Sequence, residues 1–122
     1  QIELLAVHFP ITGEKNPPLL PILFYWHSLD NLDSIYIAEI SLIKDGRKVR
    51  RWIHHIGYGI YPTLIWQKGD YLKEYYAVRM PDLSSGDYTL ELRVFDAIRE
   101  GYLKFQTGQT KVPAITLTHF KI

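Results

Sequence analysis

Cysteine is absent from the 122 residues, which excludes a disulfide framework, a thiolate zinc site and a cysteine nucleophile. Charge of one sign is also lacking, because 14 Lys and Arg residues against 13 Asp and Glu residues leave a net charge of +1. The overall charge therefore gives no reason to expect nucleic acid or an anionic membrane as a partner. Long apolar runs are missing too: the longest, residues 19–26, is far shorter than the roughly 20 residues that cross a bilayer.

What the chain does have is the composition of a globular protein. Hydrophobic residues make up 47% of it and charged residues 22%, both close to the average for folded domains. The length predicts a single domain over residues 1–122, with a core that needs no disulfide or metal to hold it. The chain begins at Gln1 rather than Met, which indicates a processed chain or a piece of a longer protein.

Alternation of apolar and polar residues with a period of two is the main pattern, and it predicts strands. In residues 36–42 the even-numbered positions are apolar, whereas Glu39 and Ser41 belong to the opposite face of a half-buried strand. Asp45-Gly46 follows, a dipeptide typical of two-residue hairpin turns, and a return strand is expected over residues 47–55. Further strands are predicted over residues 2–9, 20–26, 72–80, 88–94 and 112–122.

Seven or eight strands predict an all-β fold, an immunoglobulin/fibronectin-III-like antiparallel β-sandwich. Residues 86–90 look like the tyrosine corner of such sandwiches, in which the Tyr88 hydroxyl would bond back to the preceding loop. An eight-stranded jelly roll or a small barrel is the alternative. Residues 101–110 are weakly patterned, so the topology of the last two strands stays open.

Residues 59–70, with the sequence GIYPTLIWQKGD, are the most distinctive stretch. They resemble the G-x-x-P-T-x-x-W-x-x-G-E/D signature of an immunoglobulin-like module. That module forms the extracytoplasmic C-terminal end of many bacterial and archaeal membrane glycosyltransferases of the dolichyl-phosphate-mannose mannosyltransferase type. Other segments resemble it in the same order, namely residues 24–26, 40–46, 71–81, 85–90 and 115–122. The return strand departs from the family pattern, since it carries Trp-Ile-His-His at residues 52–55 in place of an Asp-containing segment.

The resemblance implies a non-catalytic accessory module of a glycan-handling protein that is embedded in a membrane. It also implies an extracytoplasmic location, either periplasmic or at the cell surface. In the family, the transmembrane part carries the glycosyl transfer. The matched residues are turn glycines, a rigid proline and core aromatics, which specify a fold, so any binding site has to be argued separately.

The sequence does not predict an enzyme, a cofactor or a metal site. No nucleophile-elbow, zinc-protease, P-loop or dinucleotide-binding motif occurs. His54 and His55 are neighbours on a predicted strand, so they point to opposite faces and cannot chelate one ion there. Asp30 and Asp33 lie in a polar loop that lacks the glycine and distal glutamate of a calcium-binding loop, which favours a turn.

Aromatic residues are abundant, at 14% of the chain, and they carry the ligand-binding hypothesis. Carbohydrates stack their C–H faces on exposed rings while polar neighbours bind their hydroxyls. Trp52, taken as outward-facing by alternation, together with Tyr58, Tyr61 and Tyr75, forms the predicted glycan platform. A carbohydrate-binding module is therefore the alternative to a purely structural accessory module.

Five cations lie within eight residues around the predicted hairpin turn, from Lys44 to Arg51. They indicate contact with anionic headgroups or a polyanionic glycan. A solvated tip that discourages edge-to-edge aggregation is the other interpretation, and the preferred one. A further functional alternative is a protein-interaction or dimerisation domain that pairs through an edge strand, such as the one ending at Ile122.

Overall fold

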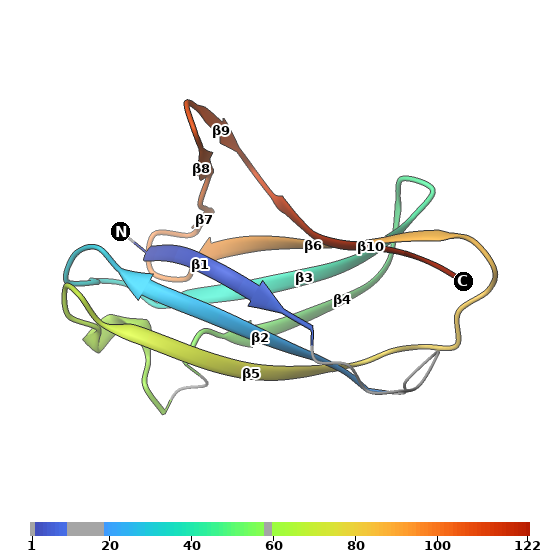
Figure 1. Cartoon of the computed structure of the whole chain (residues 1–122). Coiled ribbons are helices and arrows are strands. Elements are labelled where there is room, and N and C mark those ends of the chain that lie inside the picture. The colour runs from blue at the N-terminus through green and yellow to red at the C-terminus, as the bar shows by residue number, and fades with distance from the viewer. Residues whose placement is uncertain (1, 10–18, 58–59) are drawn as a thin grey trace. The chain divides into compact units, whose positions relative to one another are not determined.

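The computed structural model describes residues 2–9, 19–57 and 60–122, and this part of the chain is all-β with antiparallel sheets (Figure 1). Seven strands have seven or more residues and three are shorter. The short ones lie between residues 101 and 112, where the sequence pattern is weak. The strands are β1 (Ile2–His8), β2 (Leu19–Ser28), β3 (Tyr36–Lys44), β4 (Arg47–His55), β5 (Tyr71–Arg79), β6 (Asp87–Asp96), β7 (Gly101–Tyr102), β8 (Phe105–Thr107), β9 (Thr110–Val112) and β10 (Ile115–Lys121).

The chain divides into two compact units. Unit 1 comprises Gln1–Asp33 and Leu64–Leu83, and unit 2 comprises Ser34–Thr63 and Ser84–Ile122. Within the described ranges, no helix is long and apolar enough to span a membrane. A single domain over residues 1–122 stays a prediction.

Unit 1 contains a three-stranded sheet in the order β1-β2-β5. Alternate residues of β2 fill one buried face, and Ile22, Phe24 and Trp26 are at most 1% exposed, as their alternation predicts. The same face carries a buried carboxylate, Glu74 of β5, whose Oε1 accepts a hydrogen bond of 3.3 Å from the Trp26 indole. A buried carboxylate is costly without such partners, and burial followed by the Glu74 charge raises the pKa of Tyr76.

Unit 2 contains a sheet in the order β10-β6-β3-β4, with β7 paired to β6. The apolar alternation of β3 and β6 forms its buried face, as predicted. Asp45 and Gly46 connect β3 to β4 with φ values of 51° and 76°, the two positive values that a tight hairpin turn requires. The predicted tyrosine-corner bond is present, because the Tyr88 hydroxyl donates to the Ser84 carbonyl at 2.8 Å.

The orientation of Trp52 differs from the prediction because β4 contains a bulge. Its pairing with β3 shifts register between Leu42 and Ile43, so simple alternation from Val49 does not continue to Trp52. Trp52 lies directly opposite Ile40, which is fully buried, and residues directly opposite each other share a face. The half-buried Trp52 therefore lies on the core side of the sheet, while Ile53 on the other side is 51% exposed.

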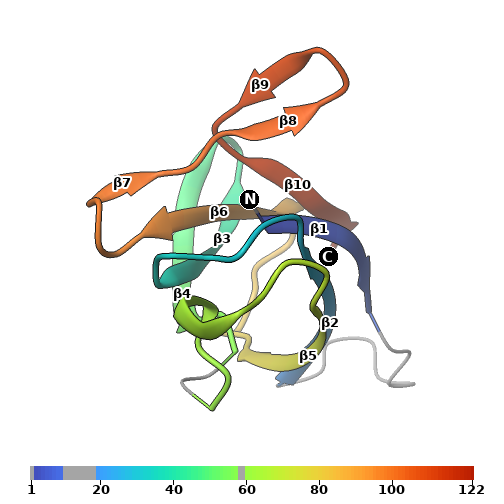
Figure 2. The same cartoon turned by 90° about the vertical axis from the view of Figure 1, so that its left-hand side faces the viewer.

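The second face of β3 is also covered at its centre, whereas the sequence predicts a solvent-facing Glu39 and Ser41. These two residues are 4% and 1% exposed. The Tyr102 hydroxyl of β7 donates to Glu39 Oε2 at 2.5 Å, and Lys48 Nζ lies 3.6 Å from Glu39 Oε1. The chain after β6 thus covers this face, and the β8–β9 hairpin extends away from the sheet (Figure 2).

Candidate functional site

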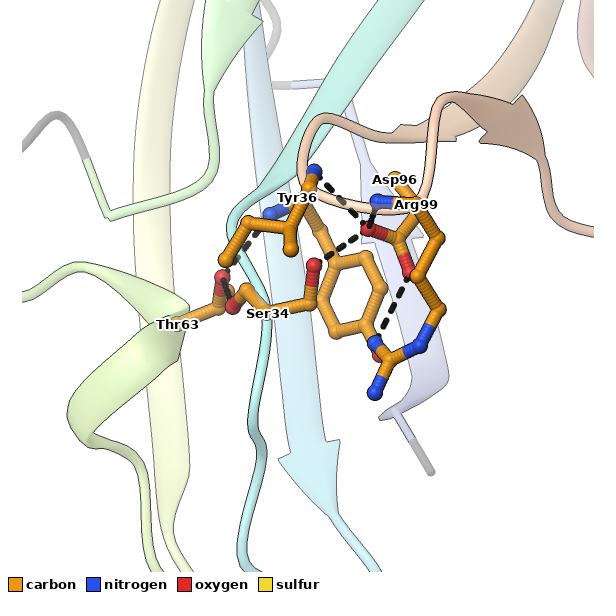
Figure 3. Close-up of polar contacts among 6 residues, drawn as sticks. Ser34, Tyr36, Thr63, Asp96 and Arg99 are labelled. Atoms are coloured by element: carbon orange, nitrogen blue, oxygen red, sulfur yellow. Dashed lines mark hydrogen bonds and ion pairs between the residues drawn. The ribbon is translucent and has the colours of Figure 1, made fainter.

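The distinctive Pro-Thr-x-x-Trp stretch has a structural role in the fold. Thr63 is fully buried, and its hydroxyl donates to the Ser34 carbonyl at 2.8 Å while accepting from the Tyr36 backbone N–H at 2.9 Å (Figure 3). Trp66 is 1% exposed, and its carbonyl accepts from the Leu32 N–H at 3.0 Å. These residues tie loops to strands and do not present a surface to a ligand.

A buried aspartate continues this polar network at the end of β6. Asp96, 4% exposed, accepts hydrogen bonds from the Ser34 hydroxyl, from the backbone N–H groups of Ile98 and Arg99, and from the Arg99 guanidinium (Figure 3). Burial by itself raises the pKa of this carboxyl group. The donors from Arg99, Ser34 and Ile98 outweigh burial and hold the pKa of Asp96 below its ordinary value. The donors from Ile98 and Arg99 close the turn after β6, and the Ser34 hydroxyl ties this turn to the segment before β3.

The residues of the predicted glycan platform have different surroundings. Trp52 is half-buried on the core side of β4, and Tyr61 is half-buried in the turn that follows β4. Tyr58 lies outside the described residues. Tyr75 is 58% exposed on β5 in unit 1, directly opposite Leu23 of β2.

Tyr75 belongs to a second set of side chains, on the outer face of the three-stranded sheet. The strand register places three rows across β1, β2 and β5 on that face. They are Glu3–His27–Tyr71, Ala6–Tyr25–Lys73 and His8–Leu23–Tyr75. We call this surface the tyrosine face.

Ring contacts and charges organise the tyrosine face. The His27 and Tyr71 rings stack with their centroids 4.2 Å apart, and His27 Nδ1 lies 3.0 Å from Glu3 Oε1. Lys73 Nζ lies 5.9 Å from the centroid of the Tyr25 ring. Tyr71 itself remains 68% exposed, so this ring is held in place from one side and presents much of its surface to solvent.

The tyrosine face combines exposed aromatic rings with polar side chains. Two exposed tyrosines stand four residues apart on one strand, which corresponds to about 13 Å along the sheet. Between and beside them lie an ammonium group, an imidazole and a carboxylate that are able to bind sugar hydroxyls. Tyr75 belongs to the platform predicted from the sequence, whereas its association with Tyr71 and with the neighbours on β2 and β1 follows from the register.

In the described ranges, no group of three or more His, Asp or Glu side chains is placed to hold a metal ion. His54 is 6% exposed and pairs with Ala38, while the exposed His55 pairs with Ile37. The two imidazoles thus lie on opposite faces of the sheet, as the alternation predicts.

No model of a known protein family matches the chain, and no curated protein matches it either. Among solved structures, chicken MD-1 complexed with lipid IVa is similar over 98% of this chain and 87% of its own, with a TM-score of 0.55 and 14% sequence identity. MD-1 is not a glycosyltransferase module, so the resemblance of this chain to that family stays a prediction. At this identity, the likeness to MD-1 shows a shared all-β fold and nothing about ligand or activity.

Proposed function

We propose that this chain is a non-catalytic, immunoglobulin-like accessory module that binds a glycan on its tyrosine face. The protein that contains this module would be membrane-associated and glycan-handling, and the module would lie on the extracytoplasmic side of the membrane. The location and the parent rest on the sequence resemblance described above. The tyrosine-corner hydrogen bond of Tyr88 supports the immunoglobulin-like assignment.

The stacked and exposed ring of Tyr71 is the observation that carries glycan binding. An exposed aromatic ring leaves apolar surface in contact with water, which is unfavourable. Stacking of a pyranose C–H face on the ring removes that surface from water. The His27 ring already covers one side of Tyr71, so little conformational entropy is lost when a sugar covers the other. Lys73 on the same strand and Glu3 beyond His27 add charged hydrogen-bonding groups to the same face, which would orient the sugar hydroxyls.

The test is a titration of the wild-type chain with cellohexaose, chitohexaose, mannohexaose and lipid IVa, followed by two-dimensional NMR. We expect saturable shifts on β5 and β2 with at least one glycan. Tyr71→Ala and Tyr75→Ala should each weaken that binding about tenfold, which corresponds to the roughly 1.4 kcal/mol expected of one ring contact. Both side chains are exposed, so the two variants should remain folded, with unfolding midpoints close to that of the wild-type chain.

Three outcomes would contradict the proposal. Flat titrations to millimolar glycan would remove the binding function and leave a structural accessory module. Shifts confined to Trp52 and Tyr61 would assign the glycan to the platform predicted from alternation. Binding of lipid IVa alone would extend the likeness to MD-1 from fold to ligand class.

Pairing through an edge strand is the weaker alternative for function. The register between β10 and β6 shifts between Thr116 and Thr118, and such a bulge bends and twists a strand. Bulged edges resist the addition of a further strand. A concentration-independent monomer mass in sedimentation would remove this alternative.

A further inference from the structure

The hairpin of β3 and β4 carries a concentration of positive charge that the tyrosine face does not use. Arg47, Lys48, Arg50 and Arg51 are all exposed on β4, and Lys44 precedes the turn. Asp45 is the one acidic residue between positions 44 and 51. The turn forms the free end of the hairpin, seen as the upper loop at the right of Figure 1.

Two of these cations are already occupied by partners within unit 2. Lys48 lies 3.6 Å from the buried Glu39 carboxylate. Lys44 donates to the Ser84 hydroxyl at 2.7 Å and lies over the Tyr88 ring. The ammonium groups of Lys44 and Lys48 therefore already interact with other groups of unit 2.

The three arginines differ from these lysines, although the charge of Arg51 acts on the Tyr102 hydroxyl. Among the described residues, no carboxylate lies within ion-pair distance of Arg47, Arg50 or Arg51. Arg51 lies opposite Ser41 and Arg50 opposite Leu42, so the bulged strand presents guanidinium groups on both sides of its edge. A planar guanidinium binds phosphate oxygens with two parallel hydrogen bonds and remains charged at any physiological pH.

Exposed apolar side chains are interleaved with these charges. Val49 is 48% exposed between Lys48 and Arg50, and Ile53 is 51% exposed two residues beyond Arg51. A peptide strand is a poor occupant, because the bulge and the charges hinder pairing along this edge. A phospholipid surface fits both features, since arginines bind headgroup phosphates while small apolar side chains enter between the headgroups.

We propose that the β3–β4 hairpin binds the surface of an anionic phospholipid bilayer through Arg47, Arg50 and Arg51, assisted by Val49 and Ile53. This inference does not depend on glycan binding. It concerns another unit of the chain and another class of ligand. The attraction is electrostatic, so added salt should weaken it. The Debye length falls from about 10 Å at 0.1 M salt to about 3 Å at 1 M.

The experiment is sedimentation of the full chain with phosphatidylcholine vesicles and with vesicles of equal parts phosphatidylcholine and phosphatidylglycerol. We expect binding to the anionic vesicles only, and its loss at high salt. The variant R47Q/R50Q/R51Q should bind about a hundredfold more weakly, since each cation near an anionic surface contributes about a fivefold factor. The matched control K68Q/K104Q/K111Q removes three exposed cations elsewhere and should retain wild-type binding.

A second measurement needs no variant, in case the triple substitution disturbs folding. In NMR spectra of the wild-type chain with phosphatidylglycerol micelles, perturbations should be confined to residues 44–53. Tyr71→Ala should leave vesicle binding unchanged, which separates this surface from the tyrosine face. Equal losses in the two triple variants, perturbations elsewhere, or binding to a polyphosphate but not to vesicles would each overturn the proposal.

Discussion

At the scale of single residues, Gly57 is a position where the backbone tolerates no side chain. Its φ is +86°, and an added Cβ would lie 2.0 Å from the Tyr61 carbonyl oxygen. The same turn is closed by the Ile60 and Tyr61 N–H groups, which both donate to the Gly57 carbonyl at 3.1 Å. The conformation and the close approach therefore both require glycine.

We predict that Gly57→Ala lowers the free energy of unfolding by more than about 2 kcal/mol, because positive φ and a backbone clash add. Urea unfolding followed by tryptophan fluorescence measures this loss. Gly46→Ala is the control, since Gly46 has φ of +76° with no atom within 4 Å of the added Cβ. That variant should lose only about 1 kcal/mol, and equal losses in the two variants would contradict the role of the close approach.

At the scale of elements, the two-residue strand β7 contributes to stability through one hydroxyl group. Tyr102 of β7 donates to the buried Glu39 of β3, and its ring meets the Phe95 ring edge-on. The hydrogen bond to Glu39, then burial, then the Glu39 charge raise the pKa of Tyr102, although Arg51 and Arg93 oppose this. The neutral hydroxyl is therefore the form that the folded state favours.

Tyr102→Phe keeps the ring but leaves Glu39 Oε2 without this donor. We expect a loss of about 1–2 kcal/mol at neutral pH, since one buried charged acceptor loses its bond. A raised folded pKa contributes stability that is complete below the unfolded pKa near 10 and is lost as pH rises through the folded pKa. The difference between the two chains, measured by urea unfolding, should thus shrink only at alkaline pH; a difference that is constant with pH would contradict the hydrogen bond.

At the scale of the whole molecule, Asp96 sets part of the acid limit of stability. Its pKa is held below the ordinary value of 3.8, so its contribution is present above that value and is lost as pH falls through the folded pKa. We predict that Asp96→Asn costs about 1–3 kcal/mol at pH 7 and that this cost diminishes under acid conditions. Thermal unfolding of both chains from neutral to acid pH measures the effect, and parallel curves at all pH values would contradict it.

Much of the fold was predictable from local signals. The Asp-Gly turn, the apolar faces of β2, β3 and β6, and the Tyr88 hydrogen bond follow from residues close in sequence. The weakly patterned region after β6 was not, because its short strands β7 to β9 have too few residues to show alternation. Two of the four predicted platform residues, Trp52 and Tyr61, are half-buried, and the exposed Tyr75 has neighbours that the sequence did not bring together.

The sequence by itself determined which segments are strands and which of their faces is apolar, because side-chain alternation is a local property of an extended backbone. Only the tertiary structure decided which strands are neighbours and in what register. The bulge in β4 brings Trp52 opposite Ile40, and β7 covers Glu39, although nothing adjacent in sequence requires either. Likewise, pairing of β1, β2 and β5 joins Glu3, His27 and Tyr71 into one row, since register depends on contacts between segments far apart in the chain.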